Sequence, residues 1–148
     1  MANVNNINIK TLLDKINKQK DGGIFLPYIQ RDFVWEEEKI FALLDSLMRG
    51  YPIGSILTWY TDESINYRPF VKDYGKDYNY DETVLSSEGD NFSRQYVIDG
   101  QQRLQSLYIA LYGTYDKKEL YFNTQSSHDG EEGYVFSFSE KPLVQCNI

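Results

Sequence analysis

Apolar residues recur at helical spacing in three stretches of the chain, which predicts three helices. The first covers residues 8–18. The second covers residues 36–49, where three glutamates suit the positive end of a helix dipole and Gly50 follows the last turn. The third covers residues 101–112, with Gly113 at the C′ position. The apolar faces comprise Ile9, Leu12, Leu13 and Ile16; Ile40, Phe41, Leu43, Leu44, Leu47 and Met48; and Leu104, Leu107, Tyr108 and Leu111.

Shorter apolar segments bounded by turn residues predict strands between and after these helices. They cover residues 24–29, 54–60, 94–98, 120–123 and 134–138. Because Pro27 has no N–H group, we expect the first to be an edge or irregular strand. The second contains no charged residue and predicts a buried strand. The order helix, strand, helix, strand, strand, helix, strand, strand predicts a small α/β domain.

The segment 61–92 is too long for an ordinary connection between two strands. It holds eight acidic and three basic residues, so it carries −5 of the net charge of −7. Its six tyrosines and phenylalanines distinguish it from a disordered linker. A solvated insertion held by a few aromatic residues and a lid or partner-binding surface are both compatible with it. In either case we expect its acidic side chains to face solvent or a partner, away from phosphate.

Composition narrows the class of protein. A length of 148 residues suits one domain, and 41% hydrophobic residues exclude a disordered tail. The negative charge argues against a general nucleic-acid coat, because phosphate affinity depends on positive surface. No apolar run is long enough to span a membrane, the N-terminus has no signal-peptide pattern, and Cys146 is the only cysteine. We therefore expect a cytoplasmic protein with no membrane partner.

The most distinctive motif, Asp99-Gly100-Gln101-Gln102-Arg103, joins a predicted strand to the third helix. Unpaired N–H groups at a helix start favour an anion, and glycine lets a ligand approach the backbone. Asp99 is suited to bind a metal ion or polarise water. The glutamines are suited to orient water or hold phosphate oxygens, and Arg103 to neutralise charge. A capping box between Asp99 and Gln102 explains the same spacing without a ligand, so both interpretations stay open.

A second motif covers residues 26–35, where Gln30, Arg31 and Asp32 interrupt an apolar and aromatic run. A planar guanidinium suits phosphate recognition, and an aromatic ring can stack on a base. The aromatic candidates are Tyr28, Phe33 and Trp35. The alternative is that these rings belong to the core and that Arg31 is a surface ion-pair partner.

Other common chemistries find little support in the sequence. The only histidine, His128, lies in a polar segment, so a histidine-based triad is not expected. Neither a P-loop pattern nor a dinucleotide-binding glycine pattern occurs.

Three blocks, residues 26–35, 45–54 and 98–104, together resemble the N-terminal domain of GmrSD-type modification-dependent restriction enzymes, within the ParB/sulfiredoxin-like superfamily. The resemblance implies one ParB/sulfiredoxin-like α/β domain over residues 1–148, with a mixed sheet, packed helices and an insertion at 61–92. It also implies a role in bacterial defence against phage or other foreign DNA. In such systems the Asp-Gly-Gln-Gln-Arg element is associated with nucleotide binding and hydrolysis, coupled to recognition of modified DNA.

The resemblance also implies a set of site residues. Those implied for nucleotide binding are Gln30, Arg31, Asp99, Gly100, Gln101, Gln102 and Arg103. Those implied for catalysis are Asp99, Gln102 and Arg103, with Asp99 as the ligand of Mg²⁺. An NTP would be the substrate or effector. The implied partners are DNA, reached through the full-length protein or complex, and a nuclease domain or subunit. The resemblance is also compatible with a homo-oligomer.

The sequence departs from the family pattern in two respects. The family commonly continues with two threonines where this chain has Gln105-Ser106, which puts a hydroxyl role at the first position in doubt. Family members are usually longer, often with a His-Asn-His-type nuclease domain, so we expect the N-terminal part of a longer protein. A non-catalytic DNA-recognition or protein-interaction module and a ParB-like nuclease remain as alternatives. The nuclease is ranked last because no clustered carboxylates suggest a two-metal site.

Overall fold

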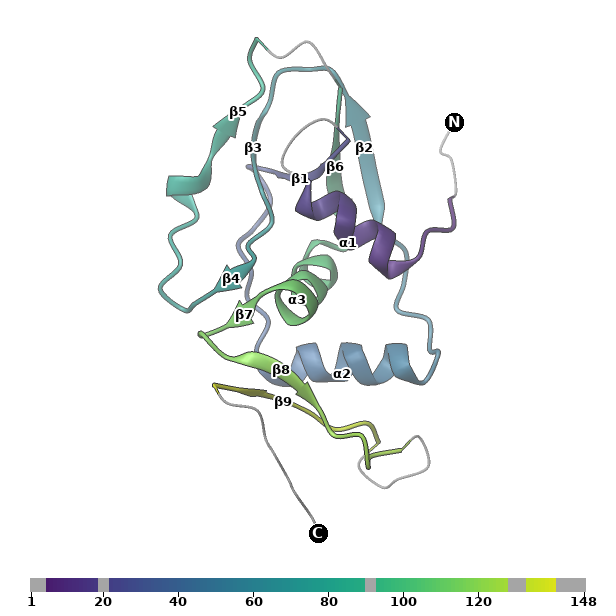
Figure 1. Ribbon diagram of the computed structural model, residues 1–148. Coiled ribbons are helices and arrows are strands. Elements are labelled where there is room, and N and C mark those ends of the chain that lie inside the picture. Colours follow the sequence, from purple (N-terminus) through teal and green to yellow (C-terminus); the bar gives the residue numbers. More distant parts are fainter. Residues whose placement is uncertain (1–4, 19–21, 90–92, 128–132, 141–148) are drawn as a thin grey trace. The chain divides into compact units, whose positions relative to one another are not determined.

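The computed structural model describes residues 5–18, 22–89, 93–127 and 133–140 (Figure 1). The chain divides into two compact units, and each is described by itself. Unit 1 consists of Met1–Arg31, Ile56–Phe70 and Tyr80–Gln101. Unit 2 consists of Asp32–Ser55, Val71–Asn79 and Gln102–Ile148. A single domain over the whole chain stays a prediction, and His128 and Cys146 lie outside the described residues.

Unit 1 is built on a five-stranded mixed sheet with strand order β2-β6-β1-β3-β5. Its strands are β1 (Ile24–Pro27), β2 (Leu57–Thr61), β3 (Asn66–Arg68), β5 (Leu85–Ser86) and β6 (Arg94–Asp99). β1 and β6 are parallel, and the other neighbours are antiparallel. The same unit contains helix α1 (Ile9–Asn17) and the short 3₁₀ helix η1 (Asp81–Thr83). The predicted α/β class is confirmed.

Helix α1 begins at Ile9, one residue after the predicted start, with Asn8 as its N-cap residue. The side chain of Asn8 accepts a hydrogen bond from the N–H of Thr11, which satisfies one of the unpaired donors of the first turn. Leu13 and Ile16 are buried, as the apolar spacing predicts. Figure 1 shows α1 in front of the sheet.

The expected positions of two strands in the sheet are wrong. β1 is central and fully buried, between β6 and β3. Pro27 is tolerated there because β6 pairs only with Ile24 and Phe25, so the missing N–H lies beyond that ladder. β2, expected to be buried, is at the edge of the sheet, and Tyr60 in it is 70% exposed.

Aromatic side chains form the centre of unit 1. Phe25, Tyr67 and Tyr96 are buried together, and the rings of Phe25 and Tyr67 meet edge to face with centroids 4.9 Å apart. The guanidinium of Arg94 lies 4.9 Å from the ring centre of Tyr67. Burial raises the pKa of the Tyr96 phenol, while Ser87 and Arg94 act in the opposite direction.

The segment 61–92 is more than a solvated insertion. It supplies the last residue of β2 and all of β3 and β5, and Tyr67, Arg68 and Phe70 in it are buried. Its acidic residues behave as expected: every one that the structure describes is exposed, and Asp90 lies outside the described residues. The segment therefore combines sheet-forming apolar residues with a charged outer surface.

Unit 2 contains helix α2 (Glu37–Met48) and helix α3 (Gln101–Tyr112) from Gln102 onward. Its strands are β4 (Asp73–Tyr74), β7 (Thr114–Tyr115), β8 (Glu119–Phe122) and β9 (Phe136–Ser139). β4 and β7 pair in parallel, and β8 and β9 form an antiparallel hairpin. Both helices match the predicted bounds within a residue, but Met48 and Leu111, expected on apolar faces, are about half exposed.

Gly113 is required for a reason other than the one expected. It does not adopt the left-handed conformation common at a C′ position. Instead, a Cβ atom at Gly113 would lie 1.7 Å from the carbonyl oxygen of Lys72, so the backbones approach too closely for any side chain.

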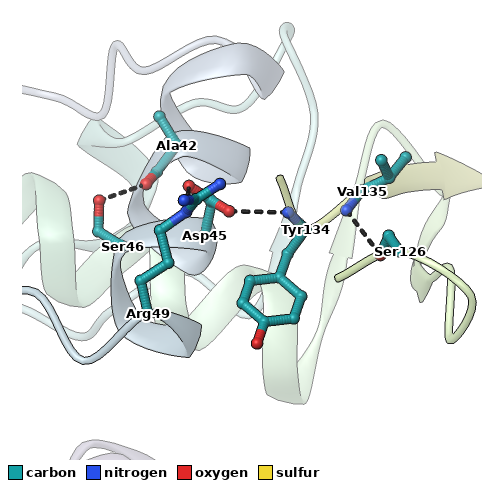
Figure 2. A network of polar contacts seen from close by, with 7 residues as sticks. All are labelled: Ala42, Asp45, Ser46, Arg49, Ser126, Tyr134 and Val135. Carbon is teal, nitrogen blue, oxygen red and sulfur yellow. Dashed lines mark hydrogen bonds and ion pairs between the residues drawn. The ribbon is translucent and has the colours of Figure 1, made fainter. Parts of the chain in front are cut away.

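Asp45 joins α2 to the hairpin of β8 and β9 (Figure 2). One carboxylate oxygen accepts from Nε of Arg49 at 2.7 Å, and the other accepts from the N–H of Tyr134 at 2.9 Å. This hydrogen bond with Asp45 raises the pKa of Arg49. Gly133 has a φ of 70°, which side chains rarely adopt, and a Cβ there would also force Arg49 Nη2 to shift. Two polar residues of the second sequence block therefore stabilise the fold of unit 2.

Candidate functional site

The Asp-Gly-Gln-Gln-Arg motif lies at the junction of β6 and α3, as predicted. Asp99 is the last residue of β6, and α3 begins at Gln101, so Gly100 occupies the N-cap position with φ of 88°. A capping box needs its acidic residue at the N-cap. Asp99 precedes that position, and the side-chain oxygen of Gln102 accepts from the N–H of Val34. The side chain of Gln102 therefore does not make the reciprocal bond of a capping box, and a capping bond from Asp99 stays a prediction.

In unit 1, the loop after β1 is fixed beside the end of β6. Nε2 of Gln30 donates to the carbonyl oxygen of Ile98 at 3.2 Å. Nε2 of Gln101 donates to the carbonyl oxygen of Arg31. The expected neighbours of the motif, Gln30 and Arg31, thus lie next to its first residues.

A third side chain, which the sequence analysis did not single out, holds the same loop. Nη2 of Arg68 donates to the carbonyl oxygens of Gln30 at 2.8 Å and Arg31 at 2.9 Å. The carbonyl oxygen of Arg31 therefore accepts from both Gln101 and Arg68.

Burial separates the residues of this region into two kinds. Gly100 and Gln101 are buried, and Gln30 is partly exposed. The side chains of Arg31 and Asp99 are exposed. The backbone of the loop is thus constrained while a cationic and an anionic side chain reach solvent.

In unit 2, two glutamine side chains of α3 hydrogen-bond to the backbone as a peptide group would: each donates to a carbonyl oxygen and accepts from an N–H. Nε2 of Gln102 donates to the carbonyl oxygen of Asp32 at 2.9 Å, and its oxygen accepts from the N–H of Val34 at 3.0 Å. Gln105 makes the equivalent pair of bonds with the N–H and the carbonyl group of Val71. Both side chains are buried; the two bonds of Gln105 are buried as well, whereas those of Gln102 are partly buried.

The hydroxyl group that this chain keeps after the motif is also used within the helix. Ser106 is fully buried and donates to the carbonyl oxygen of Gln102 at 2.8 Å. Together with Gln105, which occupies the first threonine position of the family pattern, it supports the fold of unit 2.

Arg103 connects the motif to the second sequence block, also within unit 2. Its Nη1 donates to the carbonyl oxygen of Ile53 at 2.6 Å. Gly54 follows with φ of 85°, and a Cβ there would lie 2.6 Å from the same nitrogen. Glycine at position 54 therefore suits both the positive φ and the space that the guanidinium occupies.

The three aromatic candidates of the first block differ in exposure. Phe33 is buried and meets Tyr74 edge to face, and Trp35 is partly buried, with a carbonyl oxygen that accepts from Tyr115 at 3.4 Å. Tyr28 is 46% exposed. Of the three rings, that of Tyr28 is the most accessible for stacking on a base.

The described residues contain no cluster of three or more His, Cys, Asp or Glu side chains suited to bind Mg²⁺. Mg²⁺ in nucleotide sites is commonly held by one or two carboxylates together with phosphate oxygens and water. The exposed carboxylate of Asp99 fits one ligand of such an ion, and a resident metal centre is not required.

Among the described residues, no helix is both long enough and apolar enough to cross a bilayer.

Comparison with known proteins identifies the family. The sequence model described as "GmrSD restriction endonuclease, N-terminal domain" matches residues 9–145. The chain is also similar to the uncharacterised protein MJ0686 of Methanocaldococcus jannaschii, with 36% identity over 108 residues. That similarity covers 70% of this chain but 17% of the relative. The ParB/sulfiredoxin-like label stays a prediction. Nearly the whole sequence carries the family pattern, and the chain belongs to the family of GmrSD restriction endonuclease N-terminal domains.

Proposed function

We propose that the chain is the nucleotide-binding regulatory domain of a modification-dependent DNA restriction system, and that it hydrolyses the nucleotide or senses it. Its membership of a family of restriction endonuclease N-terminal domains supports a place in such a system. The proposal adds the ligand, an NTP with Mg²⁺, and the contact residues Arg31 and Asp99. A nuclease domain or subunit would cleave the DNA.

The observation that carries the proposal is the fixed loop that presents Arg31. Gln30 binds this loop to the end of β6 and Gln101 binds it to the start of α3, yet the Arg31 side chain is exposed. A guanidinium on an ordered backbone loses less conformational freedom on binding phosphate than one on a mobile loop. Its planar donors also match two phosphate oxygens at once.

The residues beside Arg31 suit the rest of a nucleotide phosphate group. Gly100 has no side chain to obstruct the backbone, and the first amides of α3 follow it. The Asp99 carboxylate would repel phosphate by itself, so its contribution depends on a cation between the two groups. Bound Mg²⁺ supplies that positive charge, and Asp99 holds it beside the phosphates.

The structure supports positioning roles for the other residues of the motif. Gln101 holds the carbonyl oxygen of Arg31, Gln102 holds Asp32 and Val34, and Arg103 holds Ile53. In our proposal Gln101 orders the loop of unit 1 that carries Arg31, while Gln102 and Arg103 order segments of unit 2. For each of the three side chains, a contact with phosphate would require its present bonds to rearrange.

The proposal is tested by incubating the purified chain with a panel of NTPs and Mg²⁺ and measuring both thermal stability and phosphate release. At about 100 times the dissociation constant, a ligand adds roughly 2.7 kcal/mol to the unfolding free energy. For a domain of this size, we expect the melting temperature to rise by roughly 5 to 10 °C. Stabilisation without phosphate release would identify the domain as a sensor.

The matched variants are Asp99→Ala and Asp62→Ala, because both carboxylates are exposed in unit 1. Only the first should abolish the shift. If no nucleotide changes the melting temperature and Asp99→Ala behaves like the parent, the proposal is wrong.

One observation favours a second candidate, a non-catalytic module that recognises modified DNA. Tyr28 is 46% exposed and Ile29 is 90% exposed, and both precede Arg31 in the first block. An exposed ring and an apolar side chain next to a guanidinium suit a splayed base and its phosphate. Titration with modified and unmodified duplexes at two salt concentrations tests this function. Equal, negligible binding of both duplexes would refute it.

A further inference from the structure

We infer that Arg68 is a positioning residue of the proposed nucleotide site: it fixes the backbone from which Arg31 reaches the phosphates. The inference rests on the proposed function and assigns a role in it to the segment 61–92. That segment contributes neither of the motifs from which the site was predicted.

The contacts of Arg68 connect one buried side chain to the loop. The residue is 2% exposed, and its Nη2 donates to two consecutive carbonyl oxygens, those of Gln30 and Arg31. Its guanidinium also lies 4.7 Å from the ring centre of Tyr80. The ring restricts the movement of the guanidinium on one side, and the two hydrogen bonds restrict the movement of the loop backbone.

Arginine is suited to this task in a way that lysine is not. Its planar group donates from fixed directions and stacks on an aromatic face, whereas an ammonium is a compact, strongly hydrated charge. Hydrogen bonds from a charged donor are also stronger than those between neutral groups. Replacing Arg68 with lysine therefore keeps the charge but loses the geometry that holds two adjacent carbonyl groups.

The strand pairing of unit 1 places Arg68 where these bonds are available. Leu26 of β1 pairs with Arg68 of β3, and the N–H of Tyr28 donates to the carbonyl oxygen of Asn66 at 2.9 Å. β3 thus runs beside the chain until the loop begins. The segment 61–92 supports the loop through β3 and the Arg68 side chain, with its acidic residues on the outside.

The test compares nucleotide affinity and unfolding free energy in Arg68→Lys and Arg94→Lys. Both arginines are buried in unit 1 and lie against tyrosine rings, so both substitutions should destabilise the fold. Only Arg68→Lys should also weaken binding of the stabilising NTP with Mg²⁺, by about tenfold. If Arg68→Lys does not fold, Tyr80→Leu replaces it, with a smaller expected loss of affinity.

A double variant separates positioning from general stabilisation. If Arg68 acts through Arg31, Arg68→Lys should cause no further loss of affinity in an Arg31→Ala background, measured at millimolar nucleotide. An equal loss in both backgrounds, or a parent-like affinity of Arg68→Lys in a parent that binds nucleotide, overturns this inference alone. A parent chain that binds no nucleotide overturns the proposed function and this inference together.

Discussion

The guanidinium of Arg103 occupies the space in which a side chain at position 54 would begin. A Cβ on Gly54 would lie 2.6 Å from Nη1 of Arg103, the nitrogen that donates to the carbonyl oxygen of Ile53. The last residue of one sequence block and an arginine of another are therefore matched to each other within unit 2.

Gly54→Ala should displace Arg103 as well as strain the backbone. Alanine is unfavourable at a φ of 85°, and its Cβ would break the bond to Ile53. We expect a loss of about 2 to 3 kcal/mol of unfolding free energy in denaturant titrations. Gly50→Ala is the control, since Gly50 has φ of 71° but no atom near its Cβ position. It should cost about 1 kcal/mol. Equal losses in the two variants would contradict the role of Arg103.

Gln102→Met should destabilise the chain although methionine has nearly the same size and shape. The substitution leaves the N–H of Val34 and the carbonyl group of Asp32 without their side-chain partner. We expect a loss of about 1 to 2 kcal/mol, because each hydrogen bond contributes about 0.5 to 1.5 kcal/mol and these two bonds are partly buried. The same substitution at the exposed Gln125 should change stability by less than about 0.5 kcal/mol. A Gln102→Met variant as stable as the parent would show that this bond pair contributes nothing.

Tyr115 should make the stability of the chain fall at high pH. Burial, followed by Tyr74 and the nearby carboxylates, raises the pKa of Tyr115 to about 12. The unfolded phenol titrates near pH 10, so the folded chain holds this proton more tightly. The stabilisation is complete below about pH 10 and is lost as the pH rises towards 12, on the order of 2 kcal/mol in all.

Denaturant unfolding of the parent and of Tyr115→Phe across this pH range checks the Tyr115 prediction. The variant should lose less stability than the parent between about pH 10 and pH 12. Burial also raises the pKa of Tyr74 and Tyr108, so some dependence on pH should remain in the variant. Identical slopes in the two proteins would show that Tyr115 is not the group responsible.

Local patterns predicted the helices well because their signals lie within a few residues. The apolar spacing of α1, the glutamates at the start of α2 and the bounds of α3 are all local features. The positions of β1 and β2 in the sheet, central and edge, were not predictable from local patterns. The central position of β1 depends on β3, a three-residue strand within an acidic segment that gave no strand signal, and β2 lies at the edge because, among the described strands, it pairs with β6 alone.

In the candidate site, too, some contacts were predicted from the sequence, and others, made with residues distant in sequence, were not. The resemblance predicted that Gln30 and Arg31 are neighbours of the motif, and the hydrogen bonds in unit 1 agree. The structural use of Gln102 and Gln105 was not predictable, because their partners lie 68 to 70 and 34 residues away in sequence. A glutamine that binds phosphate and one that binds a peptide group have the same signature in a sequence.

The central claim is that Arg31, held on a fixed loop, binds the phosphates of a nucleotide, and calorimetric titration of the parent and Arg31→Ala with an NTP and Mg²⁺ tests it most directly. Because the Arg31 side chain is exposed, the substitution should leave the unfolding free energy within about 0.5 kcal/mol of the parent. We predict that it weakens nucleotide binding at least about tenfold, whereas Lys39→Ala, which removes an exposed cation elsewhere, does not. Equal nucleotide affinity in the parent and Arg31→Ala would contradict the account.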